Sequence, residues 1–149
     1  MPTYADNRKA LFDYEILEKL EAGLELTGAE TKAIKDGHMS LKGSYVTFHG
    51  KDAHLLNAHV SAYKPAGPQP DYEPTRSRRL LLHKREIAYL REKSQEKGLT
   101  IVPISVYNRG RFVKVEIAVA RGKHTFDKRE TIKKRDQDRE MKRVLKNER

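Results

Sequence analysis

DYEILEKLEAGLEL, residues 13–26, is the stretch of sequence that decides the fold. Its odd positions are polar, charged or glycine except for Leu17. Its even positions are apolar except for Glu18: Tyr14, Ile16, Leu20, Ala22, Leu24 and Leu26. An alternation of this length predicts one long antiparallel strand with a single buried face. A helix through Phe12, Ile16 and Leu20 competes at the start, but Gly23 and the continued alternation count against it.

Two hairpins are expected further along the chain. Residues 99–107 carry apolar side chains on both faces, and residues 112–120 place Val113, Val115, Ile117 and Val119 on one face. Gly110, within residues 108–111, favours a tight turn between these strands. Residues 44–49 and 53–62 predict the other hairpin, which turns at residues 50–52. On its second arm one face would hold Leu56, Ala58, Val60 and Ala62.

Helices are expected at two places. Residues 83–97 form the better one, in which Ile87 and Leu90 face a core and Gly98 ends the helix. Residues 29–36 offer one or two helical turns with Gly37 as the cap. Residues 64–74 hold four of the six prolines and predict a surface loop. Together these elements predict a mainly β fold: a small antiparallel barrel, closed or partly open, of the oligonucleotide-binding (OB) type with flanking helices.

The charge is concentrated at the end of the chain. The 149 residues carry 31 Lys+Arg and 21 Asp+Glu, a formal net charge of +10, which points to a polyanionic partner. Residues 121–149 hold twelve basic and six acidic residues but only five apolar ones: Phe126, Ile132, Met141, Val144 and Leu145. We therefore expect a body over residues 1–120 and a basic C-terminal tail over residues 121–149.

The tail has two interpretations. It is either a solvated, disordered basic end or a segment that becomes ordered on a nucleic-acid surface. Met141, Val144 and Leu145 have the i, i+3, i+4 spacing of a short amphipathic helix, which would form once the surrounding charges are neutralised.

Several classes of protein are excluded by composition and motifs. The chain has no cysteine, which excludes disulfides, thiolate zinc sites and cysteine nucleophiles. No stretch approaches the roughly 18 to 20 apolar residues of a membrane span, and residues 1–10 lack the apolar region of a secretory signal, so we expect a cytoplasmic protein with no membrane partner. The sequence contains no catalytic or phosphate-loop motif, and its histidines lack metal-ligand spacing. We therefore expect no enzymatic activity, no cofactor and no metal.

A basic cluster surrounds the apolar triplet Leu80–Leu82. Its members are Arg76, Arg78, Arg79, Lys84 and Arg85. One interpretation is an extended basic segment that the leucines pin to the body, with its guanidinium groups facing phosphates. The alternative is a solvated loop and helix start.

The order and spacing of short motifs resemble one family along nearly the whole chain. The matching stretches are residues 7–10 (NRKA), 14–23, the pattern Gly28-x-Glu30-x-Lys32, residues 44–46, the pattern Pro74-x-Arg76-x-Arg78-Arg79-Leu80-Leu81-Leu82, Glu86-Ile87, Gly98-x-Thr100-x-Val102-Pro103, Lys114-Val115, Gly122-Lys123 and residues 127–129 (DKR). In this series the chain resembles the SsrA-binding protein family, SmpB.

The resemblance implies a non-enzymatic RNA-binding adaptor with an OB-like body. Such a protein binds the tRNA-like domain of transfer-messenger RNA (tmRNA, SsrA) and, with elongation factor Tu held through the RNA, delivers it to stalled ribosomes for trans-translation. The body would take the place of the missing anticodon arm. The tail would probe the empty mRNA channel near the ribosomal RNA of the decoding region. We expect the protein to act as a monomer.

The resemblance also implies two sets of site residues. The expected RNA-binding set is Asn7, Arg8, Lys9, Glu30, Lys32, Arg76, Arg78, Arg79 and Lys84, and the leucine triplet matches a further RNA-binding region. The expected ribosome-binding tail set is Gly122, Lys123, Phe126, Asp127, Lys128, Arg129, Lys133, Lys134 and Arg135. Glu30 could accept hydrogen bonds from a base edge or a 2′-hydroxyl, fix a neighbouring cation, or simply favour a helix start. The chain departs from the family pattern at Thr31, His124 and Phe126, which stand where the family shows Val, Lys and His or Tyr.

Two other functions compete with the adaptor. A generic OB-fold protein for single-stranded nucleic acid, or a ribosome-assembly protein, would share the barrel and the charge, but it would not prefer a folded tRNA-like elbow over a single strand. A nuclease or other hydrolase lacks its metal-binding carboxylates or nucleophile here. Incubation with labelled RNA and Mg²⁺ tests that possibility.

Overall fold

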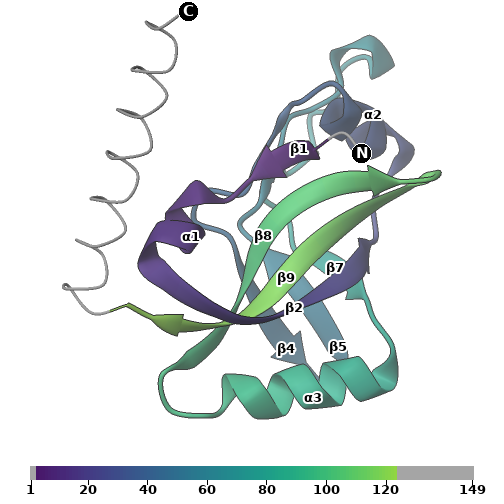
Figure 1. Ribbon diagram of the computed structural model, residues 1–149. Helices are drawn as coiled ribbons and strands as arrows, with labels where there is room; N and C mark the ends of the chain where they lie inside the picture. The colour runs from purple at the N-terminus through teal and green to yellow at the C-terminus, as the bar shows by residue number, and fades with distance from the viewer. Residues whose placement is uncertain (1–2, 124–149) are drawn as a thin grey trace, which may run out of the picture.

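The computed structural model describes residues 3–123, which form one curled sheet with three helices around it (Figure 1). The sheet is antiparallel and has seven strands in the order β1-β8-β9-β2-β7-β5-β4. These strands are β1 (Thr3–Asp6), β2 (Tyr14–Leu24), β4 (Tyr45–His49), β5 (Asp52–Leu56), β7 (Arg78–Leu81), β8 (Leu99–Arg109) and β9 (Phe112–Gly122). A separate two-stranded sheet pairs β3 (Met39–Ser40) with β6 (His59–Val60).

The sheet forms a partly open barrel. The edge strand β4 curls back to lie near β8, but the two edge strands β1 and β4 are not paired with each other in the described part of the chain. Helix α3 (Lys84–Ser94) crosses one end of the sheet, and α2 (Gly28–Lys35) lies at the opposite end (Figure 1). Leu90 of α3 is fully buried and Ile87 packs against the core, as their spacing predicted. The mainly β, OB-like architecture is therefore confirmed.

Two bulges make the long strands change faces. The register of β2 shifts between Ile16 and Glu18, and that of β8 shifts between Pro103 and Ser105. Before its bulge β2 packs Tyr14 and Ile16 against a small cluster, and after it Leu20 packs against the main core. The small cluster contains Ala10, Val102, Ile104, Ala118 and Ala120. The prediction of a single buried face along residues 13–26 is therefore wrong, because one extra residue rotates the rest of the strand.

The hairpin of β4 and β5 differs from its prediction in the same way. Ala53 and Leu55 are buried on β5, whereas Ala58 and Val60 are buried beyond it. Asn57 separates the two pairs and has a left-handed φ of 65°. This residue shifts the alternation, so the expected face that includes Leu56 and Ala62 does not form.

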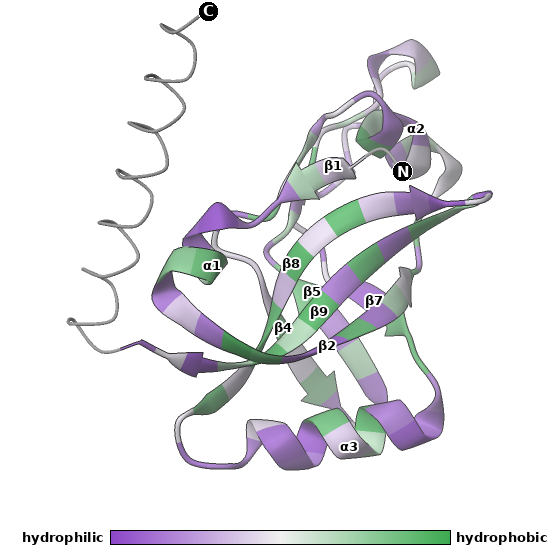
Figure 2. Ribbon diagram, in the orientation of Figure 1, coloured by the Kyte–Doolittle hydropathy of each residue, from purple (hydrophilic) through white to green (hydrophobic). Residues whose placement is uncertain are grey.

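β8 and β9 follow the prediction most closely. β8 is buried on both faces, and Val113, Val115, Ile117 and Val119 of β9 all point into the main core. Green and purple segments alternate along much of β9 in Figure 2, as expected for a strand with one buried face. β9 reaches Gly122, two residues beyond the predicted end of the body. The helix expected at residues 141–145 lies outside the described residues.

Four helices and strands have no counterpart among the predicted ones. They are β1, the short helix α1 (Arg8–Asp13), the two-residue strand β3, and β7, which lies in the sheet between β2 and β5. The Pro-rich loop contains one 3₁₀ turn, Lys64–Ala66. β7 carries Arg78, Arg79, Leu80 and Leu81, whereas Arg76 precedes the strand and Lys84 and Arg85 begin α3. Only part of the basic cluster therefore belongs to the sheet.

Candidate nucleic-acid interface

Glu30 is placed by the start of α2. Thr27 caps this helix: its Oγ1 accepts a hydrogen bond from Glu30 N at 3.1 Å, and its own backbone N donates to Glu30 Oε1 at 3.0 Å. This reciprocal pair is a capping box, which fixes the carboxylate at the first turn of the helix. Glu30 is only 1% exposed, so the cap directs the carboxylate into the body and away from solvent.

Two arginines and a tyrosine converge on this carboxylate. Glu30 Oε2 accepts hydrogen bonds from Arg78 Nε at 2.8 Å, from Arg76 Nε at 3.0 Å and from the Tyr72 hydroxyl at 3.1 Å. Arg76 Nη2 also donates to Glu30 Oε1. We call these four residues the Glu30 hub. The hub joins α2 to the segment that leads into β7.

Every N–H group of Arg78 has an acceptor inside the body. Besides Glu30, its Nη1 donates to Ala58 O at 2.8 Å and Arg76 O at 3.2 Å, and its Nη2 donates to the Tyr72 hydroxyl at 3.0 Å and Pro74 O at 2.9 Å. Arg78 is 0% exposed. This placement differs from the prediction that its guanidinium faces phosphate, because the buried carboxylate and the chain around it satisfy all five donors.

The arginines keep the Glu30 carboxylate ionised. Burial alone would raise the pKa of Glu30, but hydrogen bonds from Arg76, from the Thr27 backbone and from Arg78 outweigh it and lower the pKa to about 2. The hydrogen bonds that Arg76 donates to Glu30 in turn raise the pKa of the Arg76 guanidinium. At neutral pH the hub is therefore a carboxylate between two cations, with a net positive charge.

Only part of the hub reaches solvent. The Arg76 side chain is 33% exposed, whereas Glu30 and Arg78 are enclosed. Lys32 is exposed on the next turn of α2, with its Nζ 5.7 Å from the centre of the Tyr63 ring. Arg76 and Lys32 are therefore the predicted residues at this end of the body that can meet a phosphate, and Glu30 positions Arg76.

A second predicted group lies on α1. Asn7 caps this helix by accepting a hydrogen bond from Ala10 N at 3.2 Å, and its Nδ2 donates to Pro103 O of β8 at 2.9 Å. Asn7 is 7% exposed, so both ends of its amide are used inside the fold. The adjacent Arg8 and Lys9 are exposed. Asn7 thus positions a pair of cations that are themselves accessible.

The remaining predicted cations lie elsewhere. Arg79 projects from the opposite side of β7 to Arg78 and lies near two acids, with its Nε 3.4 Å from Asp52 and its Nη1 3.7 Å from Glu25. Lys84 is exposed in the first turn of α3. The structure therefore distributes the predicted RNA-binding set over α1, α2, β7 and α3 instead of gathering it at one point.

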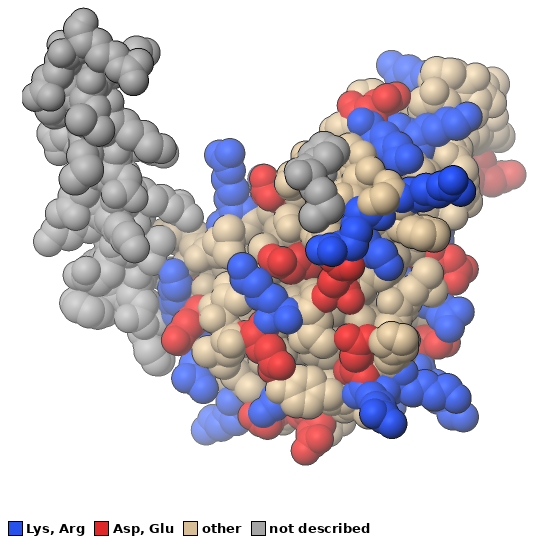
Figure 3. Space-filling view, turned by 45° about the vertical axis from the view of Figure 1, so that its right-hand side comes forward, with Lys and Arg blue, Asp and Glu red and all other residues tan. Residues whose placement is uncertain are grey.

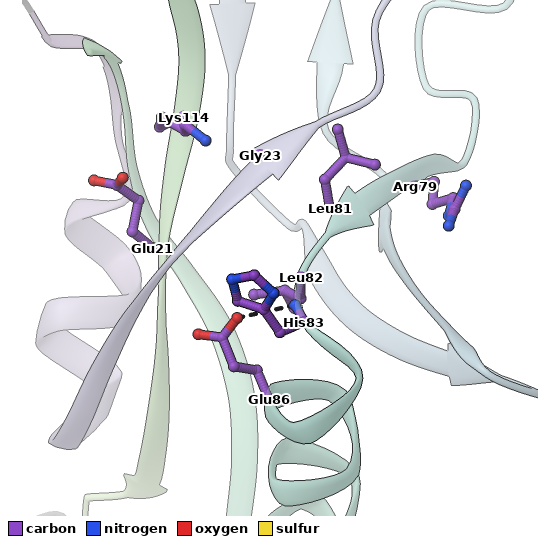
Figure 4. A pocket seen from close by; sticks show the side chains of 8 residues that line it. All are labelled: Glu21, Gly23, Arg79, Leu81, Leu82, His83, Glu86 and Lys114. Carbon is purple, nitrogen blue, oxygen red and sulfur yellow. Dashed lines mark hydrogen bonds between the residues drawn. The ribbon is translucent and has the colours of Figure 1, made fainter.

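A surface hollow of about 490 Å³ lies where β2, β7, β9 and the start of α3 meet (Figure 4). Gly23 and Leu81 lie side by side in it, with Lys114 and Glu21 on one flank and Arg79 on the other (Figure 4). The other lining residues are Leu82, His83 and Glu86. A Cβ at Gly23 would come within 3.0 Å of Leu81 Cβ, so the glycine leaves room beside a leucine that is 48% exposed.

The hollow could be found only in part from the sequence. The leucine triplet was singled out as an RNA-binding region. Glu21 and Lys114 lie in stretches that match the family, but they were not in the expected RNA-binding set, since both occupy the polar positions of strands whose apolar faces carried the prediction. Glu21 Oε2 accepts hydrogen bonds from the Tyr107 hydroxyl and, at 2.9 Å, from Arg109 Nε. The hydrogen bond from Tyr107 is the largest influence that lowers the pKa of Glu21. In turn, the pKa of Tyr107 is raised to about 12, mainly by burial and next by the hydrogen bond to Glu21.

The turn between β8 and β9 carries an exposed aromatic ring beside the same strands. Phe112 is 67% exposed, and Lys114 Nζ lies 5.7 Å from the centre of its ring. Arg109 and Arg111 are exposed in this turn as well. An accessible ring among cations can stack on a base while the cations approach phosphates.

The face shown in Figure 3 carries both signs of charge. Lys and Arg side chains are interspersed there with Asp and Glu, and they do not form one continuous basic surface. Over the described residues no group of His, Asp and Glu could hold a metal ion. No helix in that same part of the chain is long and apolar enough to cross a membrane.

Two residues of the expected tail set fall within the described chain. Gly122 is the last residue of β9, and Lys123 donates from its backbone N to Asp13 O at 2.9 Å and from its Nζ to Leu11 O at 3.3 Å. The chain therefore leaves the sheet next to α1. The others lie outside the described residues: Phe126, Asp127, Lys128, Arg129, Lys133, Lys134 and Arg135.

Comparison with known proteins places this architecture in a family. Residues 4–147 match the family described as SmpB protein. An SsrA-binding protein of Ligilactobacillus salivarius (strain UCC118) is 50% identical over 96% of this chain and 92% of its own length, and one of Trichodesmium erythraeum (strain IMS101) is 49% identical over 95% and 91%.

A solved structure agrees with the sequence relatives. A chain of the structure described as "tmRNA-SmpB: a journey to the center of the bacterial ribosome" superimposes with a TM-score of 0.67 at 39% sequence identity, and the match covers 85% of this chain and 92% of that chain. The chain belongs to the SmpB protein family.

Proposed function

We infer that this protein is a tmRNA-binding adaptor of trans-translation, which brings tmRNA (SsrA) to the ribosome. The observation that carries this function is its 50% identity to an SsrA-binding protein over nearly the full length of both chains. The match to a chain of a tmRNA–SmpB structure supports the same conclusion from the fold. The family is one of RNA-binding adaptors, and we propose that this chain likewise has no enzymatic activity.

The hollow of Figure 4 is our candidate for the direct contact with the tRNA-like domain of tmRNA. Leu81 offers an exposed apolar surface beside Gly23, where no side chain intervenes. Lys114 and Arg79 flank this surface and can approach phosphates on either side of a bound nucleotide. Phe112, on the adjacent turn, would stack on an unpaired base.

Glu30 does not contact RNA directly in this proposal. A carboxylate that is 1% exposed and held by two arginines is not available to a base edge. It fixes Arg76 at the surface and holds α2, which carries Lys32, against the Pro-rich loop. Asn7 has the corresponding role for Arg8 and Lys9 on α1. Both residues would therefore support RNA binding by positioning cations.

The body and the tail have different functions in this proposal. We propose that the body, which ends with β9, binds the tRNA-like domain, and that the tail from Gly122 onward reads the empty mRNA channel. The basic composition of residues 121–149 supports this division. In the same proposal elongation factor Tu is reached through the RNA, and the protein is a cytoplasmic monomer.

A competition experiment tests the function. The purified protein is mixed with the labelled tRNA-like domain of tmRNA and challenged with an unlabelled single strand of the same length. We expect the folded domain to be retained and the single strand to compete poorly. Equal competition would indicate a generic OB-fold protein and refute the adaptor function. Labelled RNA incubated with Mg²⁺ in a parallel tube should stay intact.

A further inference from the structure

A second, smaller hollow lies beside α1, on the side of the sheet that this helix covers. Its volume is about 310 Å³. It is lined by Asp13 and Tyr14, where α1 passes into β2, by Ser44 and Tyr45 around the start of β4, and by Thr100 and Val102 of β8. We call it the α1 hollow. None of these six residues lines the hollow of Figure 4 or belongs to the Glu30 hub.

The α1 hollow offers an aromatic ring and one charge of each sign. Tyr45 is 46% exposed although it lines the hollow. Ala10 and Val102 also line it and belong to the small apolar cluster under α1. Lys9 and Asp13 supply the two charges, and Lys9 is exposed. Such a surface suits an aromatic side chain that is followed by charged residues, because rings pack edge to face and the charges can pair.

The described chain ends at the edge of this hollow. Gly122 at the end of β9 pairs with Tyr14 of β2, and Ala120 pairs with Thr100 of β8. The last residues of β9 therefore lie between two strands that both contribute to the hollow. Lys123 then donates a hydrogen bond from its backbone N to Asp13 O at 2.9 Å, beside α1 (Figure 1). Residues 124–149 begin at this point.

The nearest apolar residue of the tail is Phe126, and it is followed by Asp127 and Lys128. Three residues separate it from Lys123, a stretch that spans at most about 10 Å. Side chains alternate between the two faces along a strand, and Ala118 and Ala120 of β9 face the small cluster under α1. Phe126 has the same even parity, so a continued alternation would direct its ring to the side of the α1 hollow.

We propose that the α1 hollow is the docking site for the start of the tail in the protein before it meets a ribosome. The Phe126 ring packs beside Tyr45, Asp127 lies near Lys9, and Lys128 lies near Asp13. The other apolar residues of the tail begin at Ile132, so they would have to close a longer loop at a larger entropic cost. This inference rests on the proposed division of the chain into body and tail, and it adds a docked state in which the tail is withheld.

Amide NMR of the full-length protein without RNA tests the occupant. Phe126→Ala removes the ring, and Ile132→Ala is the matched control, because it removes another apolar side chain of the same tail. We expect Phe126→Ala to shift the signals of Ser44, Tyr45 and Thr100, which are far from residue 126 in sequence. The control should leave these three signals in place. The shifts should be the same at two protein concentrations that differ about tenfold.

A tryptophan probe measures how strongly the tail docks. The chain contains no tryptophan, so Phe126→Trp introduces the only one. Burial of one aromatic side chain, less the cost of ordering a short connection, favours the docked form by about tenfold. Tyr45→Ala in the same chain removes a wall of the hollow and should bring this ratio to about one. The exposed fraction of the probe, and with it the acrylamide quenching constant, would then rise about fivefold.

Tyr89→Ala is the control for the probe. Tyr89 is 37% exposed on α3 and does not line the α1 hollow. This variant should leave the quenching constant of the probe unchanged. Thermal unfolding checks that Tyr45→Ala and Tyr89→Ala are folded, and the NMR comparison is independent of both, since its variants lie in the tail.

Four results would overturn the proposal. Unchanged signals of Ser44, Tyr45 and Thr100 in Phe126→Ala would show that the ring is not in the hollow. Equal shifts in Ile132→Ala would assign the hollow to another part of the tail. Shifts that disappear on dilution would indicate the tail of a second copy. Equal quenching in the Tyr45→Ala and Tyr89→Ala chains would show that Tyr45 does not shield residue 126.

The proposed function fails by a different measurement. None of these experiments contains RNA, so an empty α1 hollow leaves binding of the tRNA-like domain as it is. A wild-type protein that does not prefer this domain over a single strand refutes the adaptor function, and it does so without moving the NMR signals of the hollow.

Discussion

Replacing Glu30 with glutamine separates the charge of the Glu30 hub from its shape. The variant Glu30→Gln keeps a side chain of the same size and can still hydrogen-bond, but it removes the carboxylate that contacts Arg76 and Arg78. Arg78 stays buried at 0% exposure and loses its counter-charge. We therefore expect a large destabilisation of the folded protein.

The magnitude follows from two independent arguments. Breaking a buried ion pair by removing one partner costs about 3–5 kcal/mol. The pKa of Glu30 falls from an ordinary 4.5 to about 2 in the folded protein, and at about 1.36 kcal/mol for each pKa unit the carboxylate contributes about 3 kcal/mol at neutral pH. We expect Glu30→Gln to lower the free energy of unfolding by about 3 kcal/mol at pH 7.

The stability difference between the wild type and Glu30→Gln should depend on pH. The pKa of Glu30 is lowered on folding, so its contribution is complete above about pH 4.5 and is lost as the pH falls toward 2. The wild type should therefore lose stability over this interval more steeply than Glu30→Gln. The difference between the two proteins should be largest at pH 7 and small near pH 2.

Urea unfolding followed by far-UV circular dichroism measures these free energies, since the chain contains no tryptophan. Glu25→Gln is the matched control, because Glu25 is 61% exposed and lies 3.7 Å from Arg79. The control should change stability by less than about 1 kcal/mol. A Glu30→Gln variant that matches the control at pH 7, or whose deficit is the same at pH 2 as at pH 7, would refute the role of the carboxylate.

Four further outcomes are expected. Gly23→Val should cost about 1–3 kcal/mol of stability in thermal unfolding, because its Cβ would lie 3.0 Å from Leu81 Cβ and 3.4 Å from Leu81 Cδ1. Leu81→Ala in the same chain removes Cδ1 but keeps Cβ, so it should restore only part of the loss. Phe112→Ala should leave stability within about 0.5 kcal/mol but weaken binding of the tRNA-like domain by about 1–3 kcal/mol in a gel shift. Asn7→Ala should cost about 1–2 kcal/mol in urea unfolding, because α1 loses its cap and the bond to β8. Removal of residues 130–149 should leave RNA binding intact in a gel shift and abolish peptide tagging in a reconstituted translation assay, and loss of both activities would show that the tail is part of the fold.

Periodicity located the long strands but not the faces that they present. The alternation of residues 13–26 is broken only at Leu17 and Glu18, and the register of β2 shifts at this same place. The sequence therefore marks where the irregularity lies, but it does not show that the irregularity is a bulge. The bulge is decided by pairing with β9, where small alanines at 118 and 120 admit a second apolar cluster. A side-chain pattern along one strand cannot report a register that its neighbour imposes.

The candidate site shows a similar limit. The arginines of residues 76–79 could be identified from composition, but their directions depend on β7 lying inside the sheet, where successive side chains point to opposite faces. Arg78 points inward and Arg79 outward for this reason. Glu30 was identified from the resemblance, and two of its three expected roles agree with the structure: it fixes neighbouring cations, and it stands at a helix start. The ion pairs themselves join residues 46 and 48 positions apart, a distance over which no local pattern carries information.

The long sequence separation within the Glu30 hub has a consequence for how the protein folds and unfolds. The Arg76–Glu30 and Arg78–Glu30 contacts span sequence separations of 46 and 48 residues. A long loop must therefore close, at a cost in entropy, before these contacts can stabilise the chain. We therefore expect the hub to form after the transition state for folding, once the hairpins of β4–β5 and β8–β9 are in place. Its loss would then leave the refolding rate nearly unchanged and accelerate unfolding. The Glu30 hub therefore determines the lifetime of the folded state more than the rate of folding.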